Sequence, residues 1–198
     1  MPVPINYRTG GEVLASYDWE NLVSGIGYRR FYGCSAQLAS GNEEFLTNQS
    51  STDSKPNRQR GNSPYIFDVA FGRPAYIEGT AFVNLSTQWN SGLANTTRFI
   101  ITIYHVDALG AATSLGTATS STKSYGTYRH CIRITVTGKH FGIGESLRVH
   151  VNENVVTGSS GQQFLYMDPA SRASITDSED GTVSGTDLSI DVPFRVDI

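Results

Sequence analysis

The chain has 198 residues, of which 38% are hydrophobic and 17% charged, and its formal net charge is −3 at pH 7. That length suits one ordinary domain with an extension, or two very small domains. The sequence has no basic block of the kind that neutralises nucleic-acid phosphates, and no apolar run approaches the length of a membrane-spanning helix. Gly, Ser, Thr and Asn are abundant and helix-forming runs are missing, which favours short strands joined by turns.

The N-terminal stretch MPVPINYRTGGEV has no charged region followed by an apolar run, so we expect no secretory signal and folding in a cytoplasm. The two cysteines are Cys34 and Cys131. In a reducing compartment we expect them to be free and mostly buried thiols, and a single disulfide between them is the alternative.

Residues 1–63 differ in texture from the rest of the chain, because they lack sustained periodicity and end in the polar run NQSSTDSKPNRQRGNSP. We therefore expect an N-terminal arm and linker. The segment SYDWENLVSGIGYRRFYG gathers aromatic rings and arginines of the kind found at interface centres. The arm either wraps its own domain or docks on a neighbouring subunit, through Tyr17, Trp19, Tyr28, Arg29, Arg30, Phe31 and Tyr32.

Residues 64–198 read as a series of strands separated by clusters of Gly, Asn, Asp and Ser. In CIRITVTG, for example, Ile132, Ile134 and Val136 share one face of a strand, and RFIITIYHV is apolar on both faces, as a central strand would be. Pro193 predicts an edge strand or a bulge near the C-terminus. Seven or eight strands spaced about 8 to 12 residues apart predict an all-β fold, an antiparallel β-sandwich of the jelly-roll kind.

Candidate catalytic and metal-binding groups are few. No histidine lies in an HxH or HExxH pattern, and no GxSxG motif or activating motif surrounds either cysteine. His105 shares a strand face with Ile101 and Ile103, so we expect it to be partly buried and hydrogen-bonded. The acidic stretch DSEDG could bind Ca²⁺ if its oxygens converged, but a solvated turn is the simpler interpretation. We therefore predict no catalytic residues, no metal site and no cofactor.

Exposed aromatic rings on a β-sandwich can stack on sugars, and this is the main alternative function. Trp89 lies in the polar stretch STQWNSGLANTT, and Tyr125 and Tyr128 lie in KSYGTYRH. These three rings could form a glycan-binding site. Alternatively, Trp89 caps the end of the sandwich or lies in a subunit contact.

Asp168 is the acidic residue most suggestive of a site, because it follows the apolar run FLYM and precedes Pro169 and Arg172. A residue before proline favours an extended conformation and a turn. We interpret Asp168 as a structural turn residue that accepts hydrogen bonds from turn N–H groups or pairs with Arg172.

The stretches FIITIYHVDALGAATSLGTATS, CIRITVTGKHFGIGESLRVHV and FLYMDPASR resemble small β-sandwich proteins from the virions of tailed bacteriophages, and the aromatic arm is similar to the extended arms of such proteins. The resemblance implies a structural role without catalysis, as a capsid decoration or cement protein or a tail accessory protein. The expected partners are copies of the chain and other virion proteins, with no nucleic acid or membrane involved. The expected location is the virion, assembled in the host cytoplasm. A non-catalytic carbohydrate-binding module, in a virion adhesion or tail device, is the alternative.

Overall fold

The structure is a computed structural model that describes residues 26–38, 41–49, 57–60, 64–89, 96–158, 163–168 and 172–195. The described residues form strands and turns, which confirms the expected all-β class. No described helix is long and apolar enough to cross a membrane. The strands are β1 (Ile26–Leu38), β2 (Gly41–Thr47), β3 (Asn57–Arg60), β4 (Tyr65–Ala70), β5 (Ala75–Trp89), β6 (Thr96–Val106), β7 (Ala112–Thr119), β8 (Gly126–Phe141), β9 (Ser146–Thr157), β10 (Gln163–Tyr166), β11 (Ser174–Thr176), β12 (Val183–Gly185) and β13 (Leu188–Arg195).

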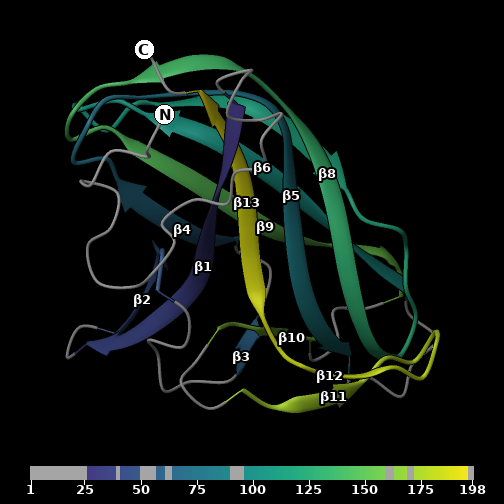
Figure 1. Cartoon of the computed structure of the whole chain (residues 1–198). Coiled ribbons are helices and arrows are strands. Elements are labelled where there is room, and N and C mark those ends of the chain that lie inside the picture. Colours follow the sequence, from purple (N-terminus) through teal and green to yellow (C-terminus); the bar gives the residue numbers. More distant parts are fainter. Residues whose placement is uncertain are drawn as a thin grey trace, which may run out of the picture.

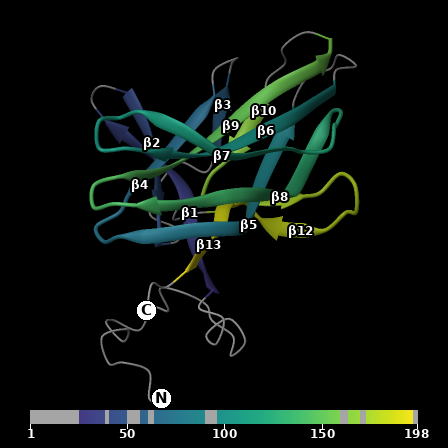
Figure 2. The same cartoon turned by 90° about the horizontal axis from the view of Figure 1, so that it is seen from above.

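The large sheet is folded on itself into two layers, as in a β-sandwich (Figure 1). One layer has the order β8-β5-β13-β1, and the short strands β10 and β3 continue it beside the end of β5. The other layer has the order β4-β9-β6-β7. β2 joins them, since it pairs antiparallel with β1 and parallel with β4. Figure 2 shows β6 and β7 in one layer and β5 and β8 in the other.

The core lies between the two layers, and strict alternation of side chains builds it. In β8 the residues Ile132, Ile134 and Val136 are buried while their neighbours are exposed, as the sequence predicts. Residues at alternate positions of β6 and β9 meet them from the opposite layer, among them Ile103 and Val149, both 0% exposed. Burying this much aliphatic surface is the main stabilising contribution to the fold.

The expected boundary near residue 63 does not separate an arm from the sheet. β1 lies between β13 and β2 in the sheet, and Phe31 on β1 is 1% exposed within the core. β2 and β3 belong to the same large sheet. The alternation of residues 26–35 is hidden in the sequence because Gly33 and Cys34 fill positions where bulky side chains would mark the pattern. A Cβ at Gly33 would come within 2.3 Å of the Leu188 side chain, so a larger residue there would force this buried side chain to move.

Pro193 lies at a bulge, which was one of the two arrangements predicted for it. The register between β13 and β5 shifts between Asp191 and Phe194. β13 is not an edge strand, because it lies between β1 and β5. The missing N–H of Pro193 is therefore accommodated by the irregular pairing rather than by an exposed edge.

The two layers come into close contact where β7 crosses β8. A Cβ added at Gly116 on β7 would lie 2.2 Å from the backbone oxygen of Thr135 on β8. Real Cβ atoms do not approach backbone oxygens this closely, so glycine is required by space alone. Leu115 beside it is buried. This contact closes the sandwich on the side where β7 and β8 are the last strands of their layers.

Replacing Gly116 with Ala should therefore destabilise the protein by about 1–3 kcal/mol, the usual cost of overpacking a filled interior. Urea unfolding followed by far-UV circular dichroism measures this. Gly72→Ala is the matched control, because nothing lies within 4 Å of its added Cβ. Equal stabilities of the two variants would contradict the close contact.

Candidate functional site

Of the predicted interface residues of the N-terminal segment, those that the structure describes separate into an inward-facing and an outward-facing group. Tyr17 and Trp19 lie outside the described residues. Phe31 points into the core, and the Arg29 guanidinium lies 4.9 Å from the centre of the Phe31 ring. Arg29 is half-buried and burial lowers its pKa. These two side chains therefore serve the interior of the fold.

Tyr28, Arg30 and Tyr32 alternate with the inward residues of β1 and lie on the opposite side of the layer, which we call the outer face. There the register aligns one residue from each of four strands, in the row Arg30–Asp191–Phe82–Arg133. The next row is Tyr32–Ser189–Asn84–Cys131. The outer face thus presents arginine and aromatic side chains drawn from distant parts of the chain.

The outer face is held in place by its own contacts. Two nitrogens of the Arg30 guanidinium donate to the two carboxylate oxygens of Asp191, each at 2.7 Å. This bidentate pairing raises the pKa of Arg30. The rings of Tyr28 and Phe82 lie with their centres 6.0 Å apart. Both rings are only partly buried, so they remain available at the surface.

The three rings predicted to bind a glycan do not form an exposed platform. Trp89 is 2% exposed, which excludes it from stacking on a sugar. The alternation of Ala81, Val83 and Leu85 extends along β5 to Trp89, so the ring faces inward at the end of the sandwich, as the capping alternative predicted. The Tyr128 hydroxyl donates to the backbone oxygen of Tyr125 at 3.1 Å, and Tyr128 is also buried. Tyr125 alone is exposed, at 63%.

Asp168 forms the structural corner that the sequence predicts. Its carboxylate is 0% exposed and accepts a hydrogen bond from Arg172 Nε at 2.5 Å. Its backbone N–H donates to the oxygen of Gly33 at 3.0 Å, and its own oxygen accepts from the Cys34 thiol at 3.2 Å. Asp168 therefore fastens the segment after β10 onto β1. Cys34 and Cys131 are both thiols outside any disulfide, Cys34 buried as expected and Cys131 exposed, contrary to expectation.

The described histidines and acidic residues lie in several separate places in the fold. Among the described residues, no three His, Cys, Asp or Glu side chains come together where they could hold a metal ion. His105 is buried and lies 2.8 Å from Glu145 Oε2, which confirms its predicted hydrogen-bonded setting. The acidic stretch DSEDG forms the turn between β11 and β12, and Asp177 there accepts hydrogen bonds from backbone N–H groups.

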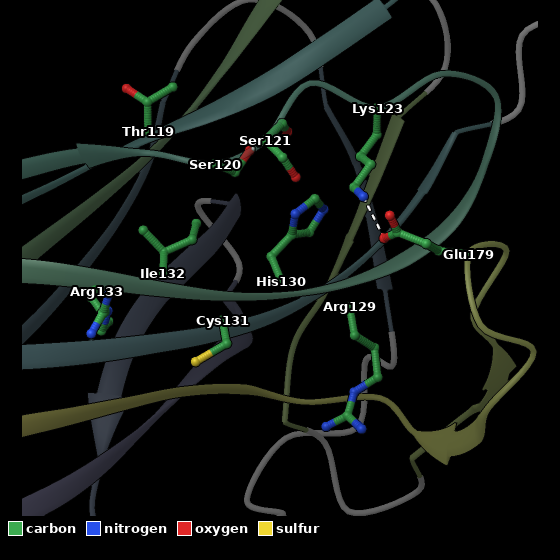
Figure 3. A pocket seen from close by; sticks show the side chains of 10 residues that line it. All are labelled: Thr119, Ser120, Ser121, Lys123, Arg129, His130, Cys131, Ile132, Arg133 and Glu179. Atoms are coloured by element: carbon green, nitrogen blue, oxygen red, sulfur yellow. Dashed lines mark hydrogen bonds and ion pairs between the residues drawn. The ribbon is translucent and has the colours of Figure 1, made fainter.

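A pocket of about 410 Å³ opens where β7 and β8 diverge. One wall is the end of β7 and the loop after it, and the other is the first half of β8 (Figure 3). His130 and Ile132 point up from β8 toward the loop, whereas Cys131 points the other way. The lining residues are Thr119, Ser120, Ser121, Lys123, Arg129, His130, Cys131, Ile132, Arg133 and Glu179.

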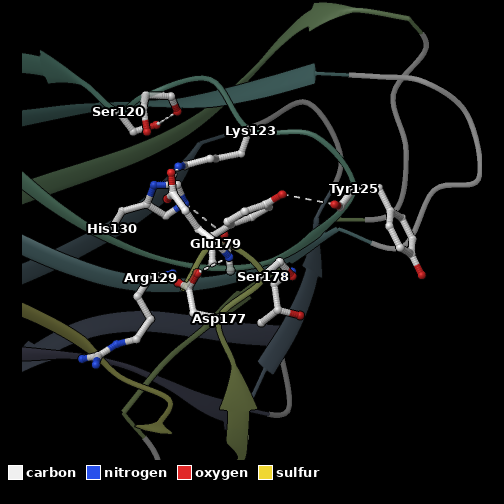
Figure 4. A network of polar contacts seen from close by, with 12 residues as sticks. Ser120, Lys123, Tyr125, Arg129, His130, Asp177, Ser178 and Glu179 are labelled. Carbon is white, nitrogen blue, oxygen red and sulfur yellow. Dashed lines mark hydrogen bonds and ion pairs between the residues drawn. The ribbon is translucent and has the colours of Figure 1, made fainter. Parts of the chain in front are cut away.

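The β11–β12 turn closes one end of this pocket through a polar network (Figure 4). The Asp177 carboxylate accepts from the N–H of Arg129 at 2.7 Å and from the N–H of Glu179 at 2.7 Å. Burial would raise the pKa of Asp177, but these backbone donors lower it overall. Glu179 in turn accepts from Lys123 Nζ at 2.5 Å, and the Lys123 ammonium lies 5.3 Å from the Tyr128 ring centre.

His130 is the perturbed titratable group of the pocket. Burial lowers its pKa to about 4, and the positive charge of Lys123 acts in the same direction. Its Nε2 lies 3.2 Å from the hydroxyl of Thr87, and its ring meets that of Phe99 edge-on. At neutral pH the imidazole is therefore neutral and hydrogen-bonded.

The chemistry that this pocket offers is hydrogen bonding and charge. The hydroxyl–imidazole contact between Thr87 and His130 is one that nucleophilic catalysis uses, but Thr87 is buried at 3% exposure. Ser120 Oγ accepts from the N–H of Phe99 and donates to the oxygen of Ser121. Sequence reasoning missed the pocket, because its residues come from a loop, a strand and a distant turn.

Neither a protein-family model nor a curated protein matches the chain by sequence. Its fold is similar to that of a CocE/NonD family hydrolase from Staphylococcus aureus, with a TM-score of 0.61 and 13% identity. An aminopeptidase from a marine sediment Thaumarchaeota archaeon gives 0.59 and 8%, and an alpha-amino acid ester hydrolase gives 0.57 and 10%. The likeness covers 87%, 87% and 84% of this chain but only 37%, 37% and 36% of those three chains.

The prediction that this chain is not an enzyme is contradicted by these likenesses, since the structures that share its fold are hydrolases and an aminopeptidase. The prediction relied on the absence of catalytic sequence motifs. That absence says little about catalytic groups that come together only in a folded protein. At this level of identity the likeness shows the fold alone. The chain spans little more than a third of the length of the enzymes that it matches.

The low pKa of His130 predicts a pH-dependent stability. The folded state binds this proton only near pH 4, whereas an unfolded histidine binds it near 6.5, so acidification through this window favours unfolding. The full loss is about 3 kcal/mol. Burial raises the pKa of Glu153 to about 7. This shift has the opposite effect, because it lowers the stability of the fold as the pH rises from the usual pKa of a glutamate toward 7.

The difference in unfolding free energy between wild type and His130→Gln reports the contribution of the histidine alone, because Glu153 is present in both proteins. Urea unfolding at about pH 7 and about pH 4.5 should show the wild type losing its advantage over the variant on acidification. A stability difference that is independent of pH would show that His130 titrates normally.

Proposed function

We propose that this chain is a structural component of a larger protein assembly and that it binds partner subunits through its outer face. The observation that carries the proposal is the row Arg30–Asp191–Phe82–Arg133, in which register places aromatic and arginine side chains on one surface. Arginine and aromatic residues are enriched at the centres of protein interfaces. An exposed sheet face also suits repeated, symmetric contacts between copies.

The assembly that we propose is the virion of a tailed phage, with the chain as a capsid-associated decoration or cement protein. The sequence resemblance to small virion β-sandwiches supports this setting. Peptide mass spectrometry of density-gradient-purified phage particles, from the phage that encodes the chain, should detect the protein. A chain that stays in the lysate and never enters particles would remove the virion setting.

Phe82→Asp should abolish association through the outer face, because it places a charge among the rings and arginines that the proposal assigns to the contact. Light scattering over a range of protein concentrations measures the oligomer. Leu109→Asp is the matched control. Leu109 is 94% exposed in the turn between β6 and β7, and these strands belong to the other layer of the sandwich. An unchanged mass for Phe82→Asp, or an equal loss in both variants, would argue against the proposal.

A second candidate rests on the structural comparisons. The chain matches about 37% of the length of a CocE/NonD family hydrolase, and this second candidate makes it the β-sandwich portion of a hydrolytic assembly. Under this candidate the folded chain, alone or mixed with the proteins encoded beside it, releases p-nitrophenol from p-nitrophenyl butyrate in proportion to its concentration. Release at the buffer rate, both with and without the proteins encoded beside it, would remove this candidate.

A further inference from the structure

Within the described part of the chain, β8 pairs with a strand, β5, along one edge only, and its backbone groups alternate between two directions. The register with β5 runs from Gly126 to Phe141 with one bulge, so every second residue of β8 forms ladder hydrogen bonds to β5. The remaining residues direct their N–H and C=O groups away from β5. Three hydrogen bonds show which residues these are. Thr127 N–H donates to Ser178 Oγ, Ser178 N–H donates to Thr127 oxygen, and Arg129 N–H donates to Asp177 Oδ2.

The same alternation places the N–H and C=O of Cys131 and Arg133 on the free edge of β8. No hydrogen bond from the described part of the chain reaches these groups. Beyond them Thr135 meets Gly116 of β7, which closes the gap between the layers. The free edge is therefore a short slot, bounded by the Asp177 turn at one end and the Gly116 contact at the other.

The slot coincides with the pocket of about 410 Å³, so the two open residues are accessible rather than covered (Figure 3). Thr119 and Ser121 line its opposite wall. Natural sheets normally protect an open edge with a turn, a charge or a covering loop. Here the chain covers Thr127 and Arg129 with its own turn, in which Ser178 pairs with Thr127 as a strand residue would. Cys131 and Arg133, the next two residues of β8 that face this edge, are left open.

Charge indicates what could occupy the slot. Its lining contains three cationic side chains, Lys123, Arg129 and Arg133, against the single carboxylate of Glu179. Lys123 is paired with Glu179, and Arg129 approaches Asp187 only at 4.0 Å. Arg133 is exposed, and it lies beside the open edge. An occupant with carboxylates on the side of the arginines would complement this surface.

We propose that the slot binds an extended acidic segment of a partner protein, which adds a short strand to β8 at Cys131 and Arg133. The main-chain groups of the segment pair with these two residues, as in other cases of strand addition. Its carboxylates approach Arg133 and Arg129 on the outer side. This site shares Arg133 with the row proposed for the outer face, but its backbone contacts at Cys131 and Arg133 are its own.

Amide hydrogen exchange followed by NMR tests the free edge directly. In the free protein the amides of Cys131 and Arg133 should exchange at least about tenfold faster than those of Ile132 and Ile134, which pair with β5. Equal protection of all four amides in the free protein would overturn the proposal, because the edge would then already be bonded.

The binding probe is the acetylated and amidated hexapeptide Val-Glu-Val-Asp-Val-Thr, titrated while the same amides are followed. Saturation should slow exchange at Cys131 and Arg133 and leave Ile132 unchanged. A basic peptide with Lys in place of both acidic residues, and an acidic peptide with N-methylated backbone, should not bind. Binding of the N-methylated peptide as tightly as the parent would show side-chain contact without strand addition and would overturn the proposal.

Two variants separate the backbone from the charge. Cys131→Pro removes the N–H that faces the slot but no ladder bond to β5, so the fold should survive and peptide affinity should fall at least about fivefold. Arg133→Glu should weaken binding of the acidic peptide about tenfold and improve binding of the basic one. Arg73→Glu, an exposed charge reversal in the β4–β5 turn, is the matched control and should change neither affinity.

The remaining outcomes also decide the matter. If Cys131→Pro unfolds, the comparison of the parent and N-methylated peptides still tests the backbone pairing. Protection of Cys131 that grows with protein concentration alone, together with a doubled mass in light scattering, would show that a second copy occupies the edge and would overturn the acidic partner. Phe82→Ser, which removes the ring without placing a charge opposite Arg133, should leave peptide binding intact, so failure of the slot and failure of the outer-face contact are distinguishable.

Discussion

The structure depends on β5, whose 15 residues pair along both edges. β8 follows one edge over its whole length, and β13 and then β10 follow the other. The inward side chains of β5, from Ile77 to Trp89, are buried against the second layer. Outside its bulges, β5 therefore has a partner strand on each side, and this brings residues from both ends of the chain onto one outer face.

The same arrangement leaves one place where pairing is incomplete. β7 and β8 are the last strands of their layers, and they approach closely at Gly116 and Thr135. From that contact toward the β7–β8 loop they diverge, and the Asp177 turn fills only the far part of the opening. A neutral His130 lines the interior side, and the arginines line the exterior side. The pocket therefore forms where the two layers separate, and its polar groups lie along the free edge of β8.

Much of the fold could be predicted from the sequence, and particular residues show why. Ile132, Ile134 and Val136 alternate in the sequence as they do in the sheet, because a strand has a period of two. Asp168 and Arg172 are close in the chain, so their pairing is local, and Pro193 lacks a donor wherever it lies. The central place of β1 was missed, because Gly33 and Cys34 obscure its alternation. Trp89 was misjudged for a related reason, since the polar residues that follow it resemble a loop while the strand before it continues to the ring.

The sequence by itself determined the secondary structure of most of the chain, since local alternation and turn residues act over a few neighbouring positions. It also determined the Asp168 corner, because a carboxylate and a guanidinium four residues apart can meet across a turn. Only the tertiary structure decided the candidate sites. The row Arg30–Asp191–Phe82–Arg133 joins residues up to 161 positions apart through strand register, and Lys123 meets Glu179 across 56 positions. Such contacts depend on which strands become neighbours, and burial of the whole core settles that choice.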